Sequence, residues 1–459
     1  MPGWDSERGL LEAEVTQRRD EGCEVPGWLS DAVAALPAGD DGAESERLWE
    51  ALGRLEPDAR LAGAEPNELA AIRALRPGGP RDLAWRPSES ELVDRLHGAW
   101  TGRAVGCALG KPVETGYGMA VEAGRTVGRA RIRSLLDAQG AWPLSDYFSA
   151  AAPAGHRPLS CPASTREAIA YMEADDDIHY TLIALRVLEE RGPEFEWSDV
   201  AWSWSRHLPY SAIYTAETQA ILNFWNRSDR LGQLRGRSGT AATPAWTRSH
   251  RNPYREWIGA QIRSDGWAWA CAGKPELAAE FAHRDASWTH TRNGVYGAMF
   301  FAAVQAAAFV EPDVRRLVDI GLSEIPRECR LARWIGAVLA WRAAAPDLEA
   351  ALDRMEGEPE LRAMSPVHTI NNAVACVLAL LYAEPQIDAA TCAAVMTGLD
   401  TDCNGATVGS VVGAITGREA YRGRMALRLN DTLKPAVVGF QELRMRDLAE
   451  RHAAVWRRV

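Results

Sequence analysis

Three consecutive aspartates, Asp175 to Asp177, stand directly before the apolar helical pattern "IHYTLIALRVLEERG". Adjacent like charges repel, so this run needs a positive partner. At a helix start, short acidic side chains can fan around the helix end and meet the positive end of its dipole. Three carboxylates around one point form an all-oxygen site for a hard divalent cation. The alternative is an N-cap with a solvated acidic turn, and the triplet alone does not decide between them.

A second acidic pair, Asp400 and Asp402, precedes another predicted helix within residues 398–417. Glycine recurs in that segment at every fourth position, as Gly405, Gly409, Gly413 and Gly417. Each glycine inside a helix costs up to about 1 kcal/mol relative to alanine. A cost repeated along one stripe indicates that another backbone approaches very closely, although a glycine-rich loop is the alternative.

The segment 96–114 shows the same spacing, with glycines at positions 98, 102, 106 and 110. We therefore expect the two glycine-striped helices to cross in contact. The first leads to Glu114, and the second begins at Asp402. A crossing at these ends would place Glu114 near Asp400 and Asp402.

Two further polar groups stand where loops enter apolar helices. His290 and Asn293 lie in the segment 283–300, and His368 precedes the helix predicted within 366–381. Capping by these side chains is the ordinary interpretation of such positions. Contact with a bound ligand is the functional alternative.

Helical patterns dominate the chain that must position these side chains. Apolar residues recur at three- and four-residue spacing, and alternating strand patterns are nearly absent. We predict an all-α fold. Residues 1–90 contain turn compositions such as "LPAGDDGAE" and "RPGGP" between short helices. We therefore predict an N-terminal helical extension over residues 1–90 and a catalytic domain over residues 91–459, with a boundary near 88–92.

The overall composition excludes several classes of partner. The formal charge is -11, from 51 basic and 62 acidic residues, which argues against a nucleic-acid partner. The N-terminal residues lack the pattern of a signal peptide, and no apolar run approaches the roughly 20 residues of a membrane span. The eight cysteines are scattered and form no CxxC pair. We expect a reduced, cytoplasmic protein without structural zinc and without a membrane partner.

Four of these segments, taken in order, resemble the ADP-ribosylglycohydrolase family, the group typified by the hydrolase that reactivates ADP-ribosylated dinitrogenase reductase. The resemblance runs from about Leu92 to about Arg422. It depends on "GAWTGRAVGCALGKPVE", "DDDIHYT", "AAEFAHRDASWTHTRNGVYGAMFFAA" and "LDTDCNGATVGSVVGAITG". It implies an all-α orthogonal multi-helix bundle with two divalent cations, Mg2+ or Mn2+, bound between helix ends.

The resemblance also implies the metal ligands. The family's first motif, Thr-Asp-Asp-Thr, aligns with residues 175–178, so Asp176 and Asp177 match its carboxylates and Asp175 replaces its first threonine. The second motif, Asp-Thr-Asp-Thr, aligns with residues 400–403. The ligands implied there are Asp400, Asp402, which would bridge the metals, and Cys403.

Cys403 departs from the family pattern, because a threonine oxygen is expected at this position. Sulfur is a poor partner for Mg2+. The departure therefore leaves either one ligand fewer or a second metal that is weaker or different.

The implied activity is hydrolysis of an N- or O-glycosidic bond of an ADP-ribosyl or related ribosyl substrate. Two cations about 4 Å apart can bind the vicinal hydroxyls of a ribose. Glu114 matches the family's mobile glutamate and is expected to act as general base or gate, with Asp177 as an alternative base. The expected contacts to substrate are His290, Asn293, His368 and Gly116.

Three alternatives stay open at this point. The substrate could be a small nucleoside-like metabolite rather than an ADP-ribosylated protein. The chain could also be a catalytically silent member of the family used for binding or structure, although its intact carboxylates argue against this. A terpene synthase would also bind Mg2+ at an aspartate-rich helix start, but its DDxxD motif is missing, because Tyr180 or Thr181 occupies the last position.

Overall fold

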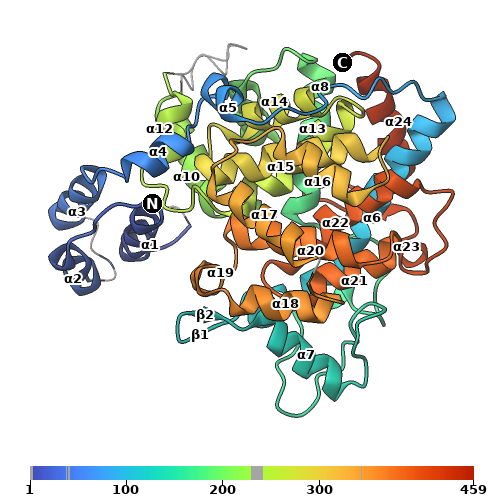
Figure 1. Cartoon of the computed structure of the whole chain (residues 1–459), viewed down its shortest axis with the longest axis horizontal. Coiled ribbons are helices and arrows are strands. Elements are labelled where there is room, and N and C mark those ends of the chain that lie inside the picture. The colour runs from blue at the N-terminus through green and yellow to red at the C-terminus, as the bar shows by residue number, and fades with distance from the viewer. Residues whose placement is uncertain (1–3, 38, 40–41, 229–240, 343) are drawn as a thin grey trace.

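The computed structural model describes residues 4–37, 39, 42–228, 241–342 and 344–459, and its regular structure there is almost entirely helical (Figure 1). The predicted all-α fold is confirmed. The strands in these ranges are two residues long and form two antiparallel hairpins, β1 (Val121–Glu122) with β2 (Arg125–Thr126) and β3 (Thr432–Leu433) with β4 (Leu443–Arg444). No helix in the described part of the chain is long and apolar enough to cross a membrane.

The helices fall into an N-terminal set and a larger body. The N-terminal set is α1 (Glu7–Asp20), α2 (Gly27–Ala35), α3 (Ala43–Gly53), α4 (Ala59–Ala64) and α5 (Leu69–Leu75). The first half of the body is α6 (Glu89–Val113), η1 (Glu114–Gly118), α7 (Gly128–Ala138), η2 (Pro162–Ser164), α8 (Asp176–Arg191), α9 (Trp197–His207), η3 (Tyr210–Ala212), α10 (Thr215–Asn226), α12 (Pro244–Ser249), η4 (Ile258–Arg263), α13 (Ser264–Ala270), α14 (Pro275–Ala286) and α15 (Arg292–Ala308). The second half is α16 (Val314–Leu322), α17 (Arg330–Trp341), α18 (Leu348–Gly357), α19 (Pro359–Ala363), α20 (Thr369–Tyr382), α21 (Ile387–Met396), α22 (Thr401–Thr416), α23 (Met425–Arg428) and α24 (Met445–Trp456).

Helices α6 and α22 pack against each other in antiparallel contact along their glycine stripes. A Cβ atom added at Gly102 would lie 1.9 Å from the carbonyl oxygen of Gly409, and one added at Gly106 would lie 1.9 Å from that of Gly405. No side chain fits at these positions. Glycine is therefore required for the two backbones to approach this closely, although it destabilises each helix. The predicted crossing of the two glycine-striped helices is confirmed.

The same contact joins the C-terminal end of α6 to the N-terminal end of α22. A Cβ atom at Gly110 would lie 2.2 Å from the carbonyl oxygen of Thr401 and 2.4 Å from the backbone nitrogen of Asp402. The Thr401 hydroxyl donates to the Gly110 carbonyl at 2.9 Å. The end of α6 therefore lies beside the start of α22, almost 300 residues later in the sequence. The candidate site residues lie at these two helix ends.

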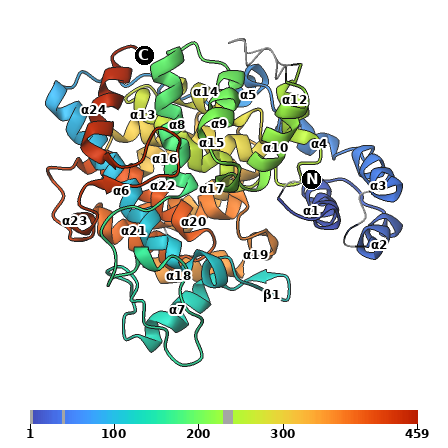
Figure 2. The ribbon, with the colours of Figure 1, turned by 180° about the vertical axis from the view of Figure 1, so that it is seen from behind.

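The N-terminal helices α1 to α3 lie at one side of the body, and α4 and α5 follow its surface (Figures 1 and 2). Helices α1 to α3 share a small core of their own that includes Leu11, Val33 and Leu48. Helix α6 begins at Glu89, with Ser88 as its N-cap, which is where the boundary was predicted. The division into two domains stays a prediction.

Buried ion pairs connect the N-terminal helices to the body. We call this set the extension network; it comprises Glu14, Glu21, Glu65, Arg255, Glu256 and Arg330. Arg255 lies 2.6 Å from Glu14 and 2.8 Å from Glu21. Arg330 lies 2.9 Å from Glu65 and 2.7 Å from Glu256. Each carboxylate of the network therefore has an arginine partner inside the protein.

Candidate metal centre

The candidate metal centre lies where the end of α6 meets the starts of α8 and α22. Asp175 is the N-cap of α8, because its Oδ1 accepts from the Asp177 backbone nitrogen at 3.0 Å. Asp400 holds the corresponding position before α22. Both acidic motifs thus stand at helix N-termini, where the dipole favours negative charge. The capping interpretation of the triplet is correct for Asp175 and does not exclude a metal site.

Two groups of side chains have the mutual spacing of metal ligands. In the first group, one ligand atom each from Cys107, Asp175, Asp177 and Asp402 lies within 4.8 Å of all the others. In the second group the same holds for Asp400, Asp402 and Cys403. All six residues are buried. Asp402 belongs to both groups and therefore lies between them.

Several carboxylate oxygens in these groups have no protein partner. Asp177 Oδ2, Asp400 Oδ1 and Asp402 Oδ1 are buried without a hydrogen bond from any described residue. An unsatisfied buried polar group is costly, and an ionised one more so. Oxygen donors at metal-ligand spacing would be satisfied by a divalent cation. The residues present therefore fit a divalent cation, the class of ion that the sequence resemblance implies.

The pKa values of the carboxyl groups in the centre also favour a cation site. Burial raises the pKa of Asp177 well above its usual range, although Arg103 opposes the change. Burial and the charge of Asp402 raise the pKa of Asp400 in the same direction. Burial and the charge of Asp175 raise the pKa of Asp402 to about 6. A bound dication would reverse these shifts, because it is the largest local charge in such a site.

Two cationic side chains of α6 already contact the first group. Lys111 Nζ lies 2.7 Å from Asp175 Oδ2, and Arg103 Nη2 lies 3.0 Å from Asp177 Oδ1. Arg103 also pairs with Asp265 at 2.9 Å. Sequence reasoning missed both cations and also Cys107. Their spacing was a usable signal, because positions 103, 107 and 111 are four residues apart and share one helical face.

The remaining acids of the predicted site lie beside the two groups rather than in them. Asp176 is half-buried, and burial and the charge of Asp175 raise its pKa well above the ordinary value. Glu114 is the C-cap residue of α6 and is also half-buried. Burial and the charges of Asp402 and Asp400 raise the pKa of Glu114 well above the usual value, as expected if it faces these acids. The catalytic role of Glu114 stays a prediction.

The residues predicted to contact substrate have partners of other kinds. Asn293 donates to Glu256 Oε1 at 2.9 Å and accepts from the Leu331 backbone at 3.0 Å, which ties it to the extension network. His290 is fully buried, with Nδ1 2.7 Å from the Thr289 hydroxyl. Burial and Arg263 lower the pKa of His290 well below the usual value, so it is neutral.

His368 lines a cavity, and Gly116 lies in η1 after α6. His368 caps α20 by accepting from the Ile370 backbone nitrogen at 3.1 Å, and it lines a cavity of about 560 Å3 together with Gln17 and Trp257. Gly116 has φ +85°, and its carbonyl accepts from Arg131 at 3.1 Å. Neither residue belongs to the metal-ligand groups, and contact with substrate stays a prediction for both.

Asn372 supports the second group through the backbone. Its Oδ1 accepts from the Asp400 backbone nitrogen at 3.2 Å and from Asn404 Nδ2 at 2.9 Å. Asn404 Oδ1 in turn accepts from the Cys376 thiol at 3.2 Å. This chain of bonds fixes the turn that enters α22 and thereby the direction of the Asp400 and Asp402 side chains.

The chain is similar to known proteins in sequence and in structure. A chain described as an ADP-ribosylglycohydrolase-related protein complex has a similar structure with a TM-score of 0.45 and 21% sequence identity, covering 80% of this chain and 99% of its own. No curated protein matches the sequence. The family model of the ADP-ribosylglycohydrolases matches residues 88–458, which is most of the chain and includes every residue of both ligand groups. The chain therefore belongs to the ADP-ribosylglycohydrolase family.

Proposed function

We propose that the protein is a metal-dependent glycoside hydrolase that cleaves an N- or O-glycosidic bond of an ADP-ribosyl or related ribosyl substrate at a site for two divalent cations. Family membership supports a hydrolase of this general class. The observation that carries the proposal is that Asp177, Asp400 and Asp402 each have a buried carboxylate oxygen without a hydrogen-bond partner among the described residues. Their two motifs are more than 200 residues apart, yet they form two ligand groups with a shared member.

Asp402 belongs to both ligand groups and would be shared by the two cations, with Asp175 and Asp177 as further ligands in one group and Asp400 in the other. Bound dications would hold the vicinal hydroxyls of the ribose and orient its anomeric carbon. Lys111 and Arg103 hold Asp175 and Asp177 in place through their ion pairs. Fixed ligands of this kind reduce the reorganisation needed when charge develops during the reaction.

Glu114 is the proposed general base. It accepts a proton from the attacking water, whose oxygen bonds to the anomeric carbon as the bond to the leaving group breaks. The leaving group takes up a proton from solvent. The charges of Asp402 and Asp400, together with burial, raise the pKa of Glu114 in the metal-free protein, which supports a position of this carboxylate beside the metal centre. The carboxylate of Asp177 would stabilise the oxocarbenium-like transition state.

The direct test is a screen of ribosyl compounds with Mg2+ and with Mn2+, assayed for release of the free sugar. ADP-ribosylated arginine and serine and a set of simple nucleosides should be included, because they separate a protein-linked substrate from a small metabolite. Asp402→Asn serves as the inactive variant and Asp319→Asn, at an exposed surface ion pair, as its matched control. Sugar release that is equal in wild type and Asp402→Asn would overturn the proposal.

A further inference from the structure

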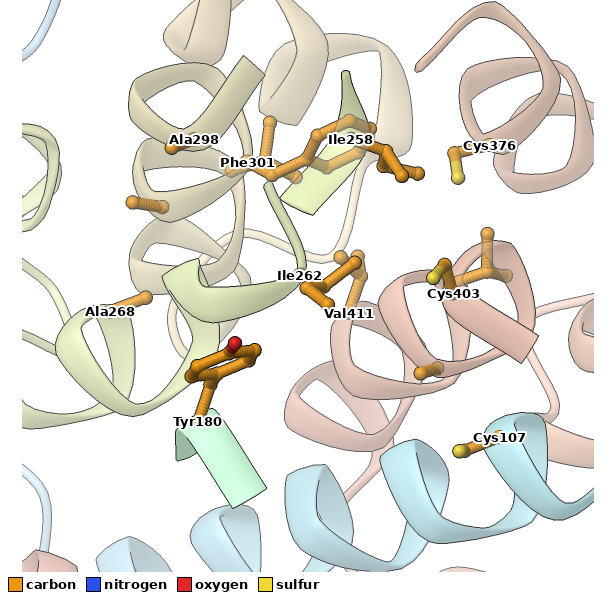
Figure 3. Close-up of a cluster of buried hydrophobic side chains, with 14 of the residues drawn as sticks. Cys107, Tyr180, Ile258, Ile262, Ala268, Ala298, Phe301, Cys376, Cys403 and Val411 are labelled. Atoms are coloured by element: carbon orange, nitrogen blue, oxygen red, sulfur yellow. The ribbon is translucent and has the colours of Figure 1, made fainter. Parts of the chain in front are cut away.

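Each of the two ligand groups contains a cysteine. Cys107 lies with Asp175, Asp177 and Asp402, and Cys403 lies with Asp400 and Asp402. Both side chains are buried, on the two glycine-striped helices that face each other across the contact (Figure 3). The nearby Cys376 differs, because its thiol donates to Asn404 and it belongs to neither group. Sulfur is thus present on both sides of the shared Asp402.

This distribution matters for the identity of the metal. Mg2+ prefers six oxygen ligands in a near-ideal octahedron and keeps several waters. Thiolates favour softer metals, and Zn2+ accepts sulfur and oxygen together in four-coordinate sites. We propose that Cys107 and Cys403 are metal ligands, one on each side of Asp402, and that the centre therefore selects Zn2+ over Mg2+. This inference rests on the proposed metal centre and concerns which metal it holds, not which bond is cleaved.

The unsatisfied oxygens support a ligand role for the whole of each group. Asp177, whose Oδ2 has no hydrogen-bond partner among the described residues, belongs to the first group with Cys107. Asp400, whose Oδ1 has none, belongs to the second group with Cys403. Each side of the centre therefore presents at least one buried oxygen that lacks a protein partner. The adjacent sulfur is at ligand spacing from that residue.

The surroundings of Cys107 also suit a thiolate once metal is bound. Lys111 and Arg103 stand one helical turn after and one turn before it on the same face of α6. Cationic neighbours favour the ionised form of a thiol. Binding of a dication would displace the thiol proton to solvent, and a sulfur lone pair would form the bond to the metal.

The test uses the full chain, stripped of metal with a chelator under reducing conditions and reloaded with Co2+ as a spectroscopic probe. A sulfur ligand produces an intense near-ultraviolet thiolate-to-cobalt charge-transfer band. We expect this band in the wild type, a weaker band in Cys107→Ser and in Cys403→Thr, and none in the double variant. Cys271→Ser, the same kind of change at a buried thiol outside the ligand groups, is the matched control and should keep the full band.

Metal competition provides the second readout. Isothermal titration of the stripped protein should show Zn2+ binding much more tightly than Mg2+. The double variant should bind Zn2+ at least about 10–100-fold more weakly than the wild type. A loss of this size already follows when a residue that hydrogen-bonds to a metal ligand is removed, and here the ligands themselves are removed. Its Mg2+ affinity should be unchanged or higher, because Cys403→Thr restores an oxygen at that position.

The outcomes separate this inference from the proposed hydrolase activity. Cobalt binding without a thiolate band, together with sugar release by the Mg2+ form, would overturn the thiol ligands and leave the hydrolase intact. Absence of any metal binding would overturn both. If the variants fail to fold, X-ray absorption of the Zn2+-loaded wild type decides the matter. A sulfur shell at about 2.3 Å supports the inference, and a shell of oxygen alone at about 2.0–2.2 Å contradicts it.

Discussion

Glu256 in the extension network and Asp177 in the metal centre are both fully buried carboxylates, yet their surroundings differ. Glu256 accepts from Arg330, Asn293 and Gln17, and despite its burial the Arg330 guanidinium holds its pKa below the usual range. Asp177 has one oxygen bonded to Arg103 and one without any described partner, and its pKa is raised. Every carboxylate of the first site has an arginine partner, whereas the second site has carboxylate oxygens without any described partner.

This difference separates a structural cluster from a functional one. A network in which every carboxylate has an arginine partner should matter for folding and little for chemistry. A centre with excess negative charge should be costly to the metal-free fold and should matter for ligand binding. Mutations in the two regions are therefore expected to have opposite effects on stability and activity, which the following experiments measure.

The largest effect is expected for Asp402→Asn. This change removes the carboxylate shared by both ligand groups. Because even one lost electrostatic contact to a transition state costs about 100–1000-fold in kcat, turnover should fall by at least that factor. Bound metal, measured by mass spectrometry after dialysis, should be lost as well. Thermal stability without metal should not fall, because the variant removes a buried charge that lacks a partner.

Glu114→Gln should reduce turnover and leave metal binding intact. The residue is outside both ligand groups, and its pKa responds to Asp402 and Asp400. Loss of a general base costs about 100–10,000-fold in rate. Assays of sugar release and of metal content check this prediction. Sugar release should stop, and the metal content should stay normal. Equal loss of metal in Glu114→Gln and Asp402→Asn would instead make Glu114 a ligand.

Arg330→Met tests the other region. It leaves the buried Glu65 and Glu256 without their arginine, and breaking a buried ion pair typically costs about 3–5 kcal/mol in the free energy of unfolding. The thermal midpoint should fall, whereas activity per folded molecule should stay near that of the wild type. Arg315→Met, at an exposed ion pair with Asp319, is the control and should change stability by no more than about 0.5 kcal/mol. A stable but inactive Arg330→Met would contradict the division between the regions.

The two regions also differ in how far local sequence predicts them. The contact between the glycine stripes of α6 and α22 could be predicted from sequence, because glycine is unfavourable inside a helix and here recurs at every fourth position. The contact of those stripes then brought the two acidic motifs together. The extension network was not predictable in this way, because Glu14 and Glu21 have the spacing of ordinary charged positions on an amphipathic helix. Their partner Arg255 lies more than 230 residues away and has no local signal.

Some residues of the metal centre were not predicted from the sequence, for a similar reason. Cys107, Lys111 and Arg103 have the four-residue spacing of one helical face, but spacing alone does not show what that face meets. Asp265, which pairs with Arg103, comes from α13 and had no motif to mark it. Asn293, which was predicted to contact substrate, bonds to Glu256 and the start of α17, and nothing in the local sequence indicated these partners. Tertiary partners decide such positions.

The smallest expected effect is the pH dependence of the metal-free protein. The folded pKa of Asp402 is raised from 3.8 to about 6, so between these values the folded state holds a proton that the unfolded state has lost. Stability therefore falls as pH rises through this window, by about 1.4 kcal/mol for each unit of pKa shift. In chelator, Asp402→Asn should gain thermal stability relative to the wild type between pH 4 and 6. Added Zn2+ or Mn2+ should reverse the order, because the ligands must ionise to bind metal and only the wild type retains them all. A parallel pH profile for the two proteins in chelator would mean that Asp402 is balanced in the fold as Glu256 is, and the contrast between the two regions would then fail.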